Sequence, residues 1–131
     1  IPGHTTGHIC FYFFDEHLLF TGDTLFSLGC GRIFEGTYEQ MYNSLSKLKS
    51  LPKETKIYCG HEYTLNNSKF CVEHDSENSS LLKKIKFIKQ QRNNNLPTIP
   101  STLQDEIDCN IFLRANDLKT FSKLRDLKDN F

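Results

Sequence analysis

The spacing of apolar residues is typical of strands in the first part of the chain. Ile9–Phe14 is an apolar and aromatic run, and Leu18–Thr21 is a shorter one. The polar residues 15–17 separate them, so we expect two strands joined by a hairpin turn. Lys56–Cys59, stopped by Gly60, predicts a further short strand.

A helix is predicted between these strands. Thr37 and Gln40 have the spacing of a capping box, and apolar residues then recur at helical intervals until Leu51-Pro52. The recurring residues are Met41, Leu45 and Leu48. A strand, a helix and a strand in this order build a sheet covered by helices, which predicts an α/β fold class for residues 1–76.

Helical spacing dominates the rest of the chain. Apolar residues form a stripe after Asn78, made of Leu81, Leu82, Ile85 and Ile88. The segments 93–95 and 97–100 break this helix, and Ser101 with Gln104 predicts the cap of another. Asp117–Lys128 again carries apolar residues on one side. Residues 77–131 are therefore predicted to be a small helical region.

Composition limits the kinds of partner that the protein can have. The chain has 131 residues, 37% of them hydrophobic, which suffices for one core. Sixteen basic and sixteen acidic residues give a net charge of zero, so nothing favours general binding to nucleic acid or to a membrane. Any charged substrate must be bound by local groups. No apolar stretch approaches the roughly 20 residues of a membrane span.

The cysteines and the first residues give two further expectations. Five cysteines, widely spaced and without a Cys-x-x-Cys pair, indicate neither a disulfide framework nor a thiolate zinc site. We therefore expect a cytoplasmic protein. The chain opens on Ile1-Pro2-Gly3-His4 without an initiating Met, so we expect it to be part of a longer protein.

Three segments place a metal-ligand type beside a glycine at a predicted strand end. They contain His4, Asp23 and His61. Imidazole and carboxylate suit Zn, Fe or Mn, and a carboxylate can bridge two ions because it has two oxygens. Taken singly, such a His is more often a surface residue, and an Asp after Gly is usually a turn former.

The motifs around these residues resemble the metallo-β-lactamase superfamily. A Pro-Gly-His-Thr turn, a Thr-Gly-Asp strand end and a late Gly-His are present, whereas the earlier His-x-His-x-Asp-His motif of that superfamily is absent from this chain. The resemblance implies that His4 ligates one metal and His61 the other, while Asp23 is the catalytic, bridging ligand. It implies two divalent metals, with zinc preferred and iron or manganese as alternatives.

Within the superfamily the chain is similar to glyoxalase II, the hydroxyacylglutathione hydrolases. The similarity lies in residues 3–9 (GHTTGHI), 20–26 (FTGDTLF), 29–37 (GCGRIFEGT) and 58–64 (YCGHEYT), and in 97–103 (PTIPSTL) and 125–131 (RDLKDNF) near the C-terminus. It implies that residues 1–76 are the C-terminal part of a metallo-β-lactamase-like domain and 77–131 a helical glutathione-binding region. The implied substrate-binding set is Arg32, Phe34, Tyr63, Arg125 and Lys128.

Some of these residues have simpler interpretations. Arg125 and Lys128 lie three apart on a predicted helix and by themselves would be solvated residues, and Phe34 would be a core residue. His8 is expected to lie behind His4, and His17 and His74 in polar turns. Cys30 between glycines is expected to be a small buried hydrophobe rather than a nucleophile.

The implied function is metal-dependent hydrolysis of S-(2-hydroxyacyl)glutathione thiolesters, as in methylglyoxal detoxification. The expected partner is this small-molecule substrate, bound by a monomer. Three alternatives stay open: a persulfide dioxygenase with one iron, another hydrolase of the superfamily fold, or a glutathione-binding fragment without activity. We expect the isolated chain to be inactive and prone to aggregation, because missing strands would expose part of its sheet.

Overall fold

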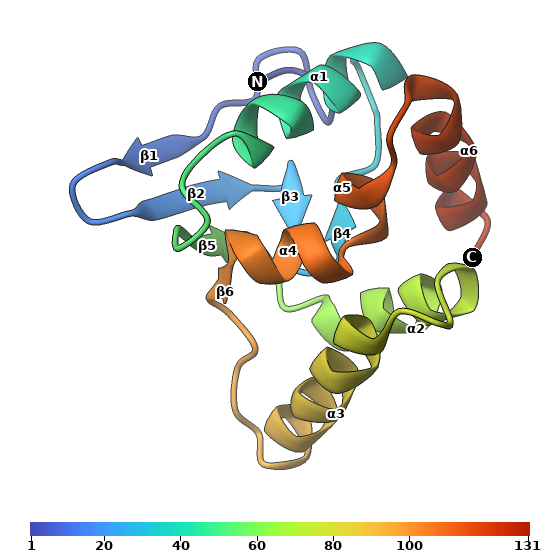
Figure 1. Ribbon diagram of the computed structural model, residues 1–131. Coiled ribbons are helices and arrows are strands. Elements are labelled where there is room, and N and C mark those ends of the chain that lie inside the picture. Colours follow the sequence, from blue (N-terminus) through green and yellow to red (C-terminus); the bar gives the residue numbers. More distant parts are fainter.

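The computed structural model describes residues 1–131 and contains a four-stranded sheet in the order β1-β2-β5-β6 (Figure 1). These strands are β1 (Phe11–Phe13), β2 (Leu18–Gly22), β5 (Lys56–Cys59) and β6 (Ser101–Thr102). β1 and β2 form the predicted antiparallel hairpin, and β5 pairs in parallel with β2. The two strands and the Lys56–Cys59 strand are thus confirmed, although β1 is shorter than the apolar run that predicted it.

A small hairpin follows β2 that the sequence pattern did not predict. β3 (Leu25–Phe26) and β4 (Gly29–Cys30) pair antiparallel in a separate two-stranded sheet. Leu28, in the connection, has a φ of 61° and is fully buried. Strands of two residues are too short to show alternation, which is why this hairpin is invisible to a periodicity argument.

Six helices accompany the strands. They are α1 (Tyr38–Lys49), α2 (Thr64–His74), α3 (Ser79–Asn93), α4 (Leu103–Cys109), α5 (Ile111–Arg114) and α6 (Leu118–Asp129). The predicted capping box of α1 is confirmed, because Thr37 accepts from the Gln40 amide and the Gln40 side chain accepts from the Thr37 amide. The α/β class with a helical second half is confirmed as well.

Two expectations about the helices were wrong in detail. Thr102, not Ser101, caps α4 by accepting from the Asp105 amide, because α4 begins at Leu103, directly after both residues of β6. The stripe on α3 is narrower than predicted, since Leu82 is 48% exposed. The helix α2 was not among the predicted elements.

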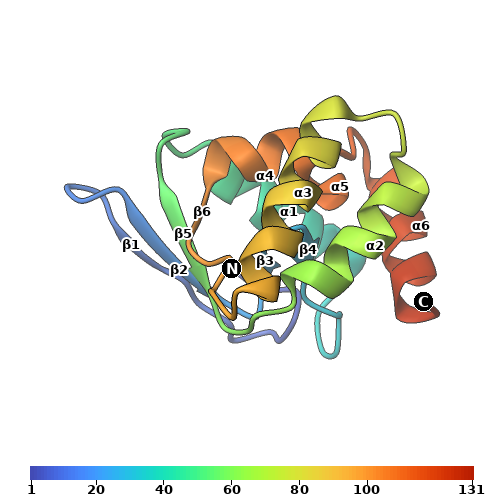
Figure 2. The same ribbon diagram turned by 90° about the horizontal axis from the view of Figure 1, so that it is seen from below.

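The helices gather on one side of the four-stranded sheet, as Figure 2 shows. Leu19 and Ile57 point into the core and are buried, whereas Phe11, Phe13 and Phe20 are exposed on neighbouring strands. Successive strand residues face opposite sides of a sheet, so one face carries the core and the other presents aromatic rings to solvent. No helix of this fold is both long and apolar enough to cross a membrane.

Candidate metal and substrate site

Two adjacent strand ends bring Asp23 and His61 together. β2 and β5 are parallel, and their last residues, Gly22 and Cys59, are paired after a register shift between Phe20 and Gly22. The Gly60 amide donates to the Gly22 carbonyl at 2.7 Å, which continues the pairing past both strands. Asp23 and His61 follow directly, so the two side chains start from neighbouring points at one edge of the sheet.

Glycines leave the space that Asp23 needs. A Cβ atom at Gly60 would lie 2.6 Å from the Asp23 Oδ1 atom, and one at Gly31 would lie 1.9 Å from the Asp23 backbone oxygen. Gly22 has a φ of +54°, a conformation that side chains rarely adopt. Glycine is therefore required beside the Asp23 carboxylate at Gly60, beside the Asp23 backbone at Gly31, and for the backbone conformation at Gly22.

His4 reaches the same place from the N-terminal loop. The Ser44 hydroxyl of α1 donates to the Pro2 carbonyl at 2.7 Å, and the Phe34 amide donates to the His4 carbonyl at 3.1 Å. The Nδ1 atom of His4 lies 2.6 Å from the Arg32 carbonyl. Because a carbonyl can only accept, Nδ1 carries a proton and donates it, which leaves Nε2 to face the cavity.

The two imidazoles face different oxygens of Asp23. The His4 Nε2 atom lies 3.7 Å from Oδ2, and the His61 Nε2 atom lies 3.3 Å from Oδ1. This arrangement fits a carboxylate that serves one ion on each oxygen, with one imidazole beside each. Within this chain, no group of three or more His, Cys, Asp or Glu side chains is placed to hold a metal ion. The three side chains are therefore donors of a suitable type for part of a metal site but do not make a complete one.

A cavity of about 410 Å³ lies over these three side chains. Its lining consists of His4, Asp23, Phe26, Arg32, Phe34, His61 and Tyr63. The Phe34 ring meets the His4 ring edge-on at 5.1 Å, and the Tyr63 ring stacks on His61 at 4.7 Å. The structure thus brings together the three predicted ligands and three of the five predicted substrate residues.

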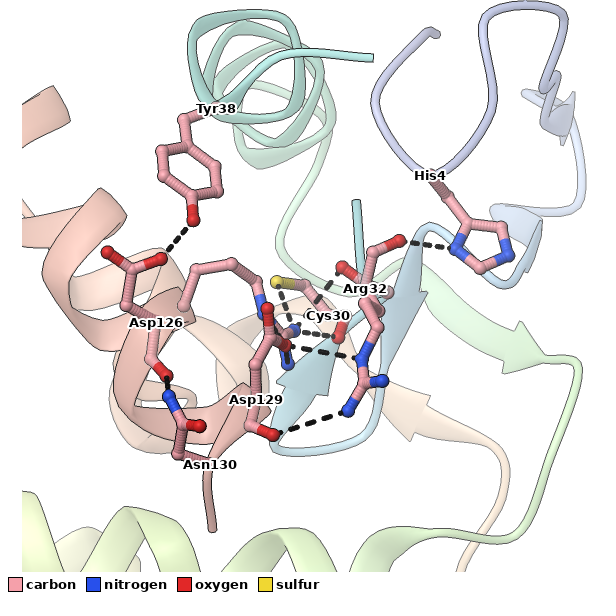
Figure 3. A network of polar contacts seen from close by, with 9 residues as sticks. His4, Cys30, Arg32, Tyr38, Asp126, Asp129 and Asn130 are labelled. Carbon is pink, nitrogen blue, oxygen red and sulfur yellow. Dashed lines mark hydrogen bonds and ion pairs between the residues drawn. The ribbon is translucent and has the colours of Figure 1, made fainter. Parts of the chain in front are cut away.

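The other two predicted substrate residues, Arg125 and Lys128, do not line this cavity. Arg125 is 4% exposed, and its guanidinium donates to the Cys30 carbonyl and to Asp129 in the network of Figure 3. The Lys128 ammonium lies over the rings of Phe70 and Phe131. Burial and then the charge of Arg125 lower the pKa of Lys128.

The remaining histidines and Cys30 lie apart from this ligand set. The His8 Nε2 atom is 3.1 Å from the Thr21 carbonyl, and its ring lies 5.9 Å from that of His4. His17 is in the β1–β2 turn, and His74 packs on Phe70. Cys30 is buried, and burial raises the pKa of its thiol, which keeps it protonated and unlike an activated nucleophile.

Sequence reasoning missed two residues near the site. Phe26 lines the cavity and packs against Tyr63 at 5.1 Å. Asp129 contacts both Arg32 and Arg125. The spacing of Arg125 and Asp129, four residues apart on a predicted helix, was a signal for an ion pair. No local signal connects Asp129 with Arg32.

Comparisons with known proteins identify the family and the fold. Residues 62–131 match the family described as hydroxyacylglutathione hydrolase C-terminus, and residues 1–61 match the metallo-beta-lactamase superfamily. The crystal structure of BLEG-1 B3 metallo-beta-lactamase has a similar fold, with a TM-score of 0.56 and 24% identity over 87% of this chain and 39% of that one.

Two relatives carry the same name. The chain is 69% identical to a hydroxyacylglutathione hydrolase of Pelagibacter ubique and 44% identical to one of Hyphomonas neptunium, in both cases over its full length. It spans 55% and 56% of these relatives, about half of their length. Because the C-terminal family match alone covers more than half of the residues, the chain belongs to the hydroxyacylglutathione hydrolase family.

Proposed function

We propose that this chain is the C-terminal part of a longer protein, here called the parent protein, that hydrolyses S-(2-hydroxyacyl)glutathione thiolesters. The preferred substrate is S-D-lactoylglutathione, and the products are D-lactate and glutathione, as in methylglyoxal detoxification in the cytoplasm. The observation that carries the proposal is the position of Asp23 between two imidazoles in a cavity that also contains Arg32. The family membership supports it.

The metal site comes first in this proposal. His4 and His61 would each hold one divalent metal, with zinc preferred to iron or manganese, and Asp23 would be the ligand that both metals share. When bound, such a pair of ions lowers the pKa of a water molecule to about 7 and polarises the substrate carbonyl. The remaining ligands come from the upstream part of the parent protein.

The substrate is held by charge and by aromatic surface. Glutathione carries two carboxylates, and a chain of zero net charge offers them only local cations. Arg32 is half exposed at the cavity and is the best placed of these cations. Phe34 and Tyr63 pack against the two imidazoles and offer apolar surface to the glutathione moiety.

Arg125 and Lys128 complete the proposed substrate set on the side of α6. Lys128 is partly exposed and adds positive charge near Arg32 and Arg125. Arg125 stays a predicted substrate residue, although its guanidinium is already bound by Cys30 and Asp129. A carboxylate of glutathione would therefore be attracted by all three cations but contacted first by Arg32 and Lys128.

The test compares the parent protein with its Asp23→Ala variant. Bound zinc, iron and manganese are measured, and hydrolysis of S-D-lactoylglutathione is followed. Near two metals per chain, with activity lost in the variant, supports the proposal. One iron with oxygen consumption on glutathione persulfide would instead indicate a dioxygenase, and neither metal nor turnover would indicate a binding module.

A further inference from the structure

Three consecutive backbone carbonyls join helix α6 to the metal-site imidazole. The Nη1 atom of Arg125 donates to the Cys30 carbonyl at 2.6 Å and to the Gly31 carbonyl at 3.3 Å. The next carbonyl, of Arg32, accepts from His4 Nδ1 at 2.6 Å. Segment 30–32 is thus bound by α6 through two carbonyls and orients His4 through the third (Figure 3).

Asp129 binds both arginines of this network. Its Oδ1 atom accepts from Arg125 Nη2 at 2.9 Å and from Arg125 Nε at 3.2 Å. The same atom lies 3.4 Å from Arg32 Nε, and the Asp129 backbone carbonyl accepts from Arg32 Nη2 at 3.4 Å. One carboxylate therefore holds the guanidinium that binds segment 30–32 and also the side chain that this segment carries.

Loss of the Asp129 charge would loosen this arrangement. Arg125 is 4% exposed, and without a carboxylate its positive charge would be buried with neutral acceptors only, which favours movement toward water. Such a movement would release the carbonyls of Cys30 and Gly31. Gly31 packs directly on the Asp23 backbone and donates to the Thr24 carbonyl at 3.0 Å, so a shift would reach the metal ligands.

We propose that Asp129 is a positioning residue for the metal site, acting through Arg125 and segment 30–32 on the orientation of His4. The assignment of His4 as a metal ligand rests on the proposed function, whereas the effect of Asp129 on the His4 imidazole does not. Groups that orient a metal-bound imidazole affect metal affinity without touching the metal. The helical C-terminal region would then support the metal site as well as the substrate.

The test uses Asp129→Asn in the parent protein, with Asp126→Asn as the matched control. Asp126 lies on the same helix, and its carboxylate contacts Tyr38 rather than segment 30–32, so both variants lose one negative charge on α6. The first measurement is the ¹⁵N spectrum of the His4 imidazole in metal-free protein. The second is zinc affinity by chelator competition, well below the unfolding temperature.

We expect Asp129→Asn to weaken the Nδ1–H signature of His4 and to lower zinc affinity about tenfold, the lower end for groups that orient a ligand. Asp126→Asn should change neither. Unchanged His4 signals and affinity in Asp129→Asn, with only a lower unfolding temperature, would overturn the proposal. If the wild-type protein binds no zinc, the proposed function fails, but the His4 spectra still decide the role of Asp129.

A second variant covers the case in which Asp129→Asn does not fold. Asp129→Glu keeps the charge beside Arg125 but moves the oxygens by one methylene group. We expect a weaker Nδ1–H signature of His4 and a lower zinc affinity in this variant too, and both changes should be smaller than in Asp129→Asn. Wild-type His4 signals together with wild-type zinc affinity in a folded Asp129→Glu protein would overturn the proposal.

Discussion

The His4 imidazole donates from Nδ1 to the backbone carbonyl of Arg32 at 2.6 Å. This hydrogen bond favours a proton on Nδ1. The other ring nitrogen, Nε2, faces Asp23. Arg32 therefore has two proposed roles. Its main chain orients a proposed metal ligand, and its side chain is the proposed cation for the substrate. Changes to the Arg32 side chain should affect substrate binding far more than metal binding.

We expect His4→Gln and His61→Gln each to remove one of the two proposed metals from the parent protein. Each imidazole faces a different oxygen of Asp23, so neither His can replace the other. Metal content per chain is measured by mass spectrometry. His17→Asn, in the β1–β2 turn, is the control and should keep both metals. Equal loss of both metals in either Gln variant would contradict the proposal that the two metals occupy separate positions.

Arg32→Met should raise KM for S-D-lactoylglutathione about tenfold, the effect of one charge-assisted hydrogen bond, and leave kcat nearly unchanged. The reason is that Arg32 lines the cavity and, in the proposed function, would contact the glutathione moiety rather than the reacting carbonyl. Steady-state kinetics of the parent protein provide the test, with the exposed Lys119→Met as control. An unchanged KM would remove Arg32 from the substrate set.

Glu106 should make stability depend on pH in the opposite sense from most carboxylates. The side chain is fully buried, and burial raises its pKa above the usual 4.5 despite hydrogen bonds from Leu28, Ser27 and Asn110. The contribution of Glu106 to the free energy of unfolding is complete below pH 4.5 and is lost as the pH rises through the folded-state pKa.

Glu106→Gln, which cannot ionise, isolates this effect. We expect wild-type parent protein to lose free energy of unfolding relative to Glu106→Gln as the pH rises above 4.5. Urea unfolding at several pH values between about 4 and 8 measures this difference, and other titrating groups cancel in it. A difference that is constant or grows in favour of the wild type would refute the raised pKa.

Local patterns predicted the elements whose signals lie within one segment. The β1–β2 hairpin, α1, β5 and α6 all follow from spacing and capping residues, and α6 begins after the Asp117 cap. The cap of α4 was misplaced by one residue because β6 contains both Ser101 and Thr102, and α4 begins only at Leu103. The start of the helix depends here on the pairing of β6 with β5, which is distant in sequence.

Thr102→Ala should therefore lower the free energy of unfolding by about 1 kcal/mol, the usual effect of losing an N-cap. The side chain of Thr102 accepts from the Asp105 amide at 3.1 Å, and Ala offers no acceptor. Thr102→Ser keeps the hydroxyl and should retain most of the stability. Urea unfolding of both variants is the measurement, and equal losses would show that the hydroxyl is not the cause.

The site was predictable only in part, and for a physical reason. His4, Asp23 and His61 carry glycines beside them at strand ends, so their motifs are visible in the sequence. The contact between Arg32 and Asp129 joins residues 97 positions apart and depends on how α6 packs. The same packing buries Arg125. The sequence did not predict this burial, because the helical pattern by itself indicates a solvated residue at that position.

The open face of the sheet should control the behaviour of the isolated chain. Phe11 and Phe13 of β1 are 59% and 49% exposed, and Phe13 packs edge-on with the exposed Phe20. A contiguous aromatic surface favours self-association. We expect the 131-residue chain to aggregate and the double variant Phe11→Lys/Phe13→Lys to stay monomeric longer, as measured by light scattering.

The same double variant should have the opposite effect in the parent protein. If upstream residues cover this face, two lysines there would be buried without partners and lower the free energy of unfolding by several kcal/mol. Phe87→Lys, on α3 and 45% exposed, is the control and should have little effect in either protein. A parent protein that tolerates both lysines would show that the face stays open to solvent, because only an uncovered surface accepts two charges without loss of stability.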